Sequence, residues 1–233
     1  LEWTVNAYTL TFAVFLLTGA ALGDRFGRKR MFIIGVAIFT AASAFAAMST
    51  SVEMLLVGRM AQGIGAAIVT PLTLTLLSAS VVAERRGVAL GAWGAVGGVA
   101  IAVGPLVGGA IVEGVAWNWI FWVNVPIGIA LIPLAWFGLR ESRGPAGRLD
   151  LPGGGLASVG LFGIVWALIN GNGEGWTSPI IIGAIAAGVA FLVGFLLWER
   201  RAPAPMLPPR FFKSRAFSFA NLSAMLMSFG MFG

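Results

Sequence analysis

Long apolar runs separated by short clusters of basic residues constrain this 233-residue chain more than any other feature. The run over residues 180–197 contains no charged residue and is apolar on every side of a helix. Across the whole chain 58% of the residues are hydrophobic and only 10% are charged, whereas about 25% are charged in an ordinary soluble domain. We therefore expect a membrane protein, because too few polar residues remain to cover a globule in water.

The apolar runs are long enough for helices that cross a bilayer, which takes about 20 residues at the rise of an α-helix. A transmembrane β-barrel would instead need alternating hydrophobicity in units of about ten residues. We therefore predict an all-α, polytopic transmembrane helical bundle with eight spans. They are Trp3–Leu22, Met31–Met48, Met54–Ser80, Val88–Val112, Trp117–Leu139, Pro152–Ile169, Pro179–Trp198 and Ala216–Gly233.

The basic residues predict the orientation of these spans. Of the 15 lysines and arginines, 14 lie in alternate loops and Arg59 lies inside a span. The basic loops are 25–30, 85–86, 140–148 and 200–215. Because loops rich in lysine and arginine face the cytoplasm, we predict a multi-pass protein of the plasma (inner) membrane. The loop Arg25–Arg30 is then cytoplasmic, and the chain starts outside. Charge spread over four short loops also favours the lipid bilayer over a nucleic acid as the partner.

The residue types that are missing exclude several kinds of chemistry. There is no cysteine and no histidine, which removes thiolate metal sites, thiol nucleophiles and the usual general base. We expect no enzyme, no metal site and no cofactor. All nine acidic residues fall near predicted helix ends, so none is placed to exchange a proton at the middle of the membrane. They are Glu2, Glu53, Glu113 and Glu174 outside, and Asp24, Glu84, Glu141, Asp150 and Glu199 inside.

The first basic loop contains an acid among its bases. Asp24 closes one predicted helix and Arg28 opens the next, so we expect an ion pair at the membrane surface. Gly27 between them can take the positive φ that such a turn needs. Charge anchoring with a glycine turn is the simpler alternative. It accounts for the bases and the glycine but not for the acid.

Arg59 lies about one and a half turns inside its predicted span. A charge within the membrane is costly and marks a function by default, although the side chain can also snorkel to the outer interface. Gln62 and Gly63 follow three and four residues later, so the three residues share one helical face.

A third cluster lies near the end of the fourth span and combines glycines with a proline: Gly104, Pro105, Gly108 and Gly109. Glycines four residues apart form a ridge on which another helix can pack closely, and Pro105 removes a backbone hydrogen bond. Generic helix packing accounts for the glycines alone.

In this order, the three stretches resemble signatures of the major facilitator superfamily. The residues that match its loop between helices two and three are Leu22, Asp24, Arg25, Gly27, Arg28 and Lys29. The chain departs from the signatures at Ala20, Gly23 and Ala100. The resemblance implies a gating loop at 24–29 that latches the two halves of a transporter. It also implies a link between Arg59 and proton transfer, and an antiporter signature at 104–109.

Two predicted spans after a short link resemble the extra helices of the fourteen-helix drug:proton antiporters of the EmrB/QacA type. The chain then corresponds to helices two to nine of a longer protein, and the coupling carboxylate falls outside it. The implied parts are an N-terminal transport bundle (1–139), a cytoplasmic link (140–151), two linker helices (152–198), a basic loop (199–215) and the start of a C-terminal bundle (216–233).

The implied function is proton-coupled export of lipophilic or cationic drugs by alternating access, with an adaptor and an outer-membrane channel as further partners. The alternatives are an exporter of one metabolite, siderophore or antibiotic, and a non-transporting membrane scaffold or receptor. Asn6 and Tyr8 on the first span are candidates to line a substrate cavity. A polar contact between helices explains these two residues equally well.

Overall fold

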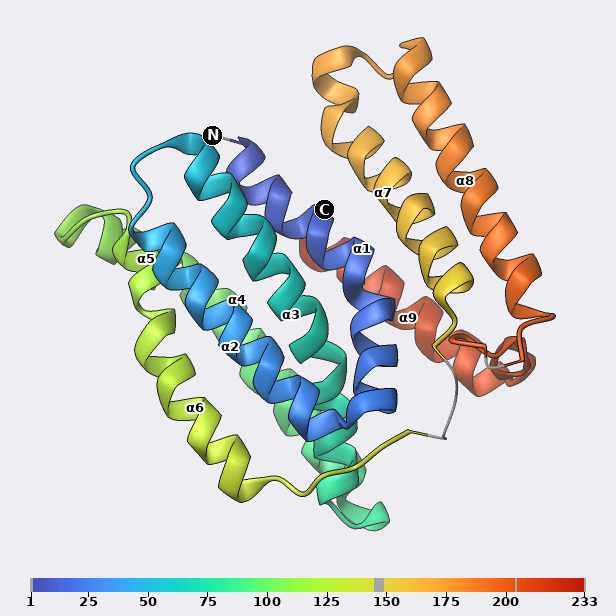
Figure 1. Cartoon of the computed structure of the whole chain (residues 1–233), viewed down its shortest axis with the longest axis horizontal. Coiled ribbons are helices and arrows are strands. Elements are labelled where there is room, and N and C mark those ends of the chain that lie inside the picture. The colour runs from blue at the N-terminus through green and yellow to red at the C-terminus, as the bar shows by residue number, and fades with distance from the viewer. Residues whose placement is uncertain (1, 145–148, 204, 233) are drawn as a thin grey trace.

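A computed structural model describes residues 2–144, 149–203 and 205–232 (Figure 1). Within these ranges the chain forms helices and no strands, which confirms the all-α prediction. The longer helices are α1 (Glu2–Phe26), α2 (Arg28–Ala47), α3 (Val52–Ser80), α4 (Arg86–Gly114), α6 (Asn124–Gly138), α7 (Leu151–Glu174), α8 (Pro179–Glu199) and α9 (Arg215–Phe232). Shorter elements are η1 (Ala83–Arg85), α5 (Trp119–Trp122) and η2 (Pro209–Lys213).

Seven segments of the described chain are helical, long enough and apolar enough to cross a membrane. They correspond to the first seven predicted spans, with α5 and α6 together forming one span, Trp119–Gly138. The eighth predicted span forms helix α9 but is not among the seven. Its 18 residues include Arg215 and Asn221, which lower its hydropathy. Gly233, the end of that predicted span, lies outside the described residues.

Helix α3 is the centre of the bundle, because it packs on α1 along one side and on α2 along another (Figure 1). Glycines permit this close approach. A Cβ atom built on Gly63 would lie 2.6 Å from the backbone oxygen of Tyr8 in α1. One built on Gly65 would lie 2.8 Å from the backbone nitrogen of Phe39 in α2. Larger residues at either position would force the helices apart.

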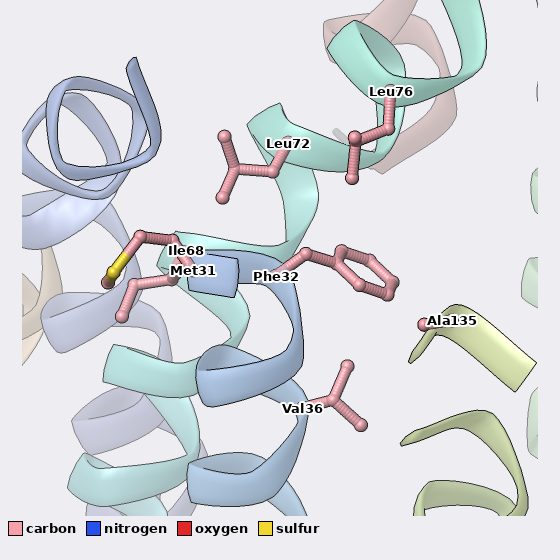
Figure 2. Close-up of a cluster of buried hydrophobic side chains, with 7 residues drawn as sticks. All are labelled: Met31, Phe32, Val36, Ile68, Leu72, Leu76 and Ala135. Atoms are coloured by element: carbon pink, nitrogen blue, oxygen red, sulfur yellow. The ribbon is translucent and has the colours of Figure 1, made fainter. Parts of the chain in front are cut away.

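The buried apolar cluster lies where α2, α3 and α6 meet (Figure 2). Its members are Met31, Phe32 and Val36 from α2, Ile68, Leu72 and Leu76 from α3, and Ala135 from α6. These contacts fix the positions of the ends of α2 and α6 that carry the first basic loop and the link at 140–144.

Helices α7 and α8 form a hairpin that attaches to the bundle through α1 (Figure 1). The hydroxyl of Ser158 in α7 donates to the backbone oxygen of Val14 in α1 at 3.0 Å. The Asp150 carboxylate caps α7 by accepting from the Gly153 amide, and it also accepts from the Trp198 indole at 2.8 Å. This tryptophan lies in the last turn of α8, so one carboxylate joins the two ends of the hairpin.

Helix α4 differs from α1, α2 and α3 because none of its residues is buried in the described chain. The helix continues without interruption through Pro105, although a proline cannot donate a backbone hydrogen bond. Its faces are therefore open to surroundings other than the helices described here.

Candidate functional site

The turn between α1 and α2 has the geometry that its sequence predicts. Gly27 takes a φ of 108°, which a residue with a Cβ adopts only under strain. On either side of it, Asp24 and Arg28 form the expected ion pair, with Nη2 2.7 Å and Nε 2.8 Å from the Asp24 Oδ1. Both the positive φ and the ion pair are confirmed.

Glu141 completes this turn, a role that its position in the sequence does not predict. Its carboxylate accepts from the backbone amides of Lys29 at 3.0 Å and Arg30 at 3.2 Å. These amides open α2, where Gly27 offers no side chain to cap them, and an anion at a helix N-terminus is favoured by the helix dipole. The only sign of this contact in the sequence is that Gly27, at the start of α2, has no side chain that could cap the helix. The sequence does not indicate which acidic residue accepts from the amides at the start of α2.

The link that contains Glu141 also pairs with the turn through its backbone. The Arg28 amide donates to the Ser142 oxygen at 2.8 Å, and the Gly144 amide donates to the Asp24 oxygen at 3.1 Å. The Lys29 ammonium donates to the backbone oxygen of Trp136. These contacts join the α1–α2 turn to the end of α6. Among the predicted basic residues of this link, Arg148 lies outside the described residues.

Arg25, the remaining predicted member of the turn, does not join this network of contacts. Its guanidinium carbon lies 5.3 Å from the ring centre of the neighbouring Phe26. Arg25 is exposed, so its charge remains available to surroundings beyond the described chain.

Arg59 is held between α1 and α3. Its Nε donates to the backbone oxygen of Thr4 at 2.8 Å, and Nη1 donates to the Gln62 side-chain oxygen at 2.8 Å. The guanidinium carbon lies 4.4 Å from the centre of the Tyr8 ring and 5.8 Å from that of Phe121, within the range of cation–π attraction. The predicted common face of Arg59 and Gln62 is therefore present as a direct contact.

Gln62 also contacts α2. Its amide nitrogen donates to the Ser43 hydroxyl at 2.7 Å, and that hydroxyl donates to the Phe39 backbone oxygen at 2.7 Å. The side chains of Gln62 and Ser43 are 1% and 0% exposed. Ser43 was not predicted as a site residue. No periodicity within one helix reveals which residue of its neighbour it will face.

The two residues proposed to line a cavity occupy different settings. Tyr8 stacks on Phe12 with ring centres 6.1 Å apart and also contacts Arg59. Asn6 is half-buried on the same helix. A role in binding substrate stays a prediction for both.

The glycine–proline cluster of α4 is not brought to either site within the described chain. A Cβ atom built on Gly104, Gly108 or Gly109 would meet nothing within 4 Å. Close helix packing at this ridge stays a prediction.

The fold and these sites define a helical membrane protein that crosses the bilayer several times. Its Arg59 cluster lies within the bundle, and its Asp24–Arg28 turn lies at one end. The sequence profile of the Major Facilitator Superfamily matches residues 1–166. The chain belongs to this superfamily.

Several relatives that match the chain are named as resistance, export or multidrug transport proteins. It is 43% identical to the methylenomycin A resistance protein of Bacillus subtilis, over 99% of this chain and 50% of that protein. It is 36% identical to the tetracenomycin C resistance and export protein of Streptomyces glaucescens, over 100% of this chain and 44% of that protein. It is 34% identical to the multidrug transporter protein MdtP of Bacillus subtilis, over 100% of this chain and 43% of that protein. The chain thus spans half or less of the length of these relatives, which are named for transport or resistance and not as enzymes.

Proposed function

We propose that this chain supplies the N-terminal bundle and two linker helices of an antiporter that exports lipophilic or cationic drugs. Protons entering the cell drive the export through alternating access. The observation that carries the proposal is the Arg59 charge, which α1, Gln62 and two aromatic rings hold inside the bundle. The names of two relatives, which refer to resistance, export and multidrug transport, support the same class of activity.

In this proposal Arg59 acts on a carboxylate that belongs to the complete transporter outside this chain. The acids whose side chains the structure describes lie in links or within three residues of a helix end, so none of them is placed for the exchange. A nearby guanidinium lowers the pKa of a carboxyl group. Arg59 would thereby set how readily the carboxylate gives up its proton when the drug enters.

The Asp24–Arg28 turn is the proposed gate on the cytoplasmic side. Its geometry, with Gly27 at positive φ and the Glu141 carboxylate at the start of α2, supports a latch that meets the second half of the transporter. The proposed parts are 1–139 for the bundle, 140–151 for the cytoplasmic link, 152–198 for the linker helices, 199–215 for a cytoplasmic basic loop and 216–233 for the start of the second bundle. An adaptor and an outer-membrane channel are the proposed further partners.

The decisive experiment replaces Arg59 in the complete transporter, reconstituted in liposomes with a proton gradient. Arg59→Gln should abolish proton-driven drug uptake into these liposomes while the amount of inserted protein stays the same. Arg59→Lys keeps the charge but not the fork that reaches Thr4 and Gln62 together, so it should restore only part of the activity. Arg200→Gln, in the basic loop, is the matched control. Unchanged drug and proton movement in Arg59→Gln would overturn the proposal.

A second candidate is an exporter of a single antibiotic. The names of the methylenomycin and tetracenomycin C resistance relatives favour it. Transport of a panel of unrelated drugs separates the two candidates, since a dedicated exporter would move one chemical class and a multidrug exporter several.

A further inference from the structure

We infer that Ser43 is a positioning residue for the proposed proton-coupling site, because it holds the Gln62 amide in place with its oxygen toward Arg59. This inference rests on the function proposed above for Arg59. It adds a residue from α2, a helix that carries no part of the signature around Arg59.

The argument starts from the direction of the hydrogen bonds. The Ser43 hydroxyl uses its only proton on the Phe39 backbone oxygen, so it can only accept from Gln62. Gln62 must therefore present its NH₂ group to Ser43, at 2.7 Å. The amide oxygen is then left to face the Arg59 Nη1, at 2.8 Å.

The opposite orientation of the amide would be unfavourable at both ends. It would place an NH₂ group against the guanidinium, where donor would meet donor, and it would leave the amide oxygen facing a hydroxyl whose proton is already used. With Gln62 and Ser43 at 1% and 0% exposure, bulk water does not reach the amide to compensate it. Ser43 and Arg59 thus favour the same one of two amide orientations that have almost the same shape.

Removing the hydroxyl leaves the buried NH₂ group of Gln62 without its acceptor. In Ser43→Ala the Gln62 side chain is no longer held from α2, so we expect it to move toward another acceptor and give up its bond to Arg59. The guanidinium then keeps only its bond to the Thr4 backbone. A hydrogen bond to a charged group is equivalent to roughly a tenfold change in an equilibrium. We expect a fall of about this size in the rate of proton-coupled drug exchange.

The test uses two variants of nearly equal volume in the complete transporter, reconstituted as above. Ser43→Thr keeps the hydroxyl, whereas Ser43→Val replaces it with a methyl group. Ser43→Thr should retain exchange near the wild-type rate, while Ser43→Val and Ser43→Ala should lose about tenfold in turnover with the KM for drug little changed. Thr73→Val is the matched control, since the Thr73 hydroxyl donates to its own helix at Val69.

A double-mutant cycle keeps the inference falsifiable if the valine variant is poorly inserted. Adding Ser43→Ala to a Gln62→Ala background should cause no further loss, because both substitutions break one chain of contacts. Additive losses, or equal activity of the threonine and valine variants, would overturn the inference. If Arg59→Gln abolishes exchange while Ser43→Ala is indistinguishable from wild type, only this inference fails. If Arg59→Gln has no effect, the proposed function fails with it.

Discussion

The carboxylate of Glu141 accepts a hydrogen bond from the backbone amide of Lys29 at 3.0 Å, although the two residues are 112 positions apart in the chain. This contact ties the segment after α6 to the first turn of α2. It places an acid at a helix start that has no capping side chain of its own. The turn between α1 and α2 is therefore built from two distant parts of the sequence.

Replacing Glu141 should destabilise this end of the bundle. We expect Glu141→Ala to lower the free energy of unfolding by about 1 kcal/mol, because two amides at the start of α2 lose their acceptor. Glu141→Gln retains one carbonyl oxygen and should cost less. Thermal unfolding in detergent measures both, with Glu84→Gln in η1 as the control. Equal stability of the alanine variant and the wild type would contradict the assignment of Glu141 as a cap.

Gly27→Ala should be destabilising by about 1 kcal/mol or more, since an alanine at a φ of 108° is strained. Its Cβ would also lie 2.8 Å from the Glu141 carboxylate. Gly87→Ala is a matched control, because a Cβ there meets nothing within 4 Å and the position is helical. Denaturant unfolding compares them. A Gly27→Ala variant as stable as Gly87→Ala would contradict this prediction, because it would show that the turn adopts another backbone conformation without cost.

Breaking the Asp24–Arg28 ion pair should affect transport much more than stability. The two side chains are 43% and 21% exposed, respectively, and ion pairs near the surface contribute about 0–1 kcal/mol. Asp24→Asn should therefore change the unfolding midpoint little and, if the turn is a gate, reduce drug export strongly. Unfolding and transport are measured on the same preparation. A large loss of stability, or full export, would each count against the gate.

The proposed topology predicts that two introduced cysteines face opposite sides of the membrane. The chain has no cysteine of its own, so Arg30→Cys and Gly173→Cys can each be labelled singly. Both positions are exposed. A membrane-impermeant maleimide applied to intact cells should label Gly173→Cys and not Arg30→Cys. Glu84→Cys, predicted to lie on the cytoplasmic side, serves as a second negative. Labelling of both Arg30→Cys and Gly173→Cys from outside would refute the threading.

Gly63→Ala tests the contact between α1 and α3. The added Cβ would lie 2.6 Å from the Tyr8 backbone oxygen, and overpacking of this kind typically costs about 1–3 kcal/mol. Because the same helices hold Arg59, the variant should also weaken proton-coupled export. Gly97→Ala, in open space on α4, is the control for helix propensity. Loss of export with unchanged stability would place Gly63 in the transport step itself.

Much of this protein follows from patterns that lie within short stretches of sequence. Seven spans follow from apolar length alone, and the Asp24–Arg28 pair follows from a spacing of four residues around a glycine. The Arg59–Gln62 contact follows in the same way from the turn of one helix. The eighth predicted span forms helix α9 in the described residues, and its crossing of the membrane stays a prediction.

Only the tertiary structure decided that Glu141 reaches Lys29 and that Ser43 reaches Gln62. It also left the glycine ridge of α4 without a neighbour among the described helices. The physical reason is that hydrogen bonds act over about 3 Å. Contacts between helices therefore depend on how far one helix is shifted and rotated against another, which the spacing of residues within either helix does not specify.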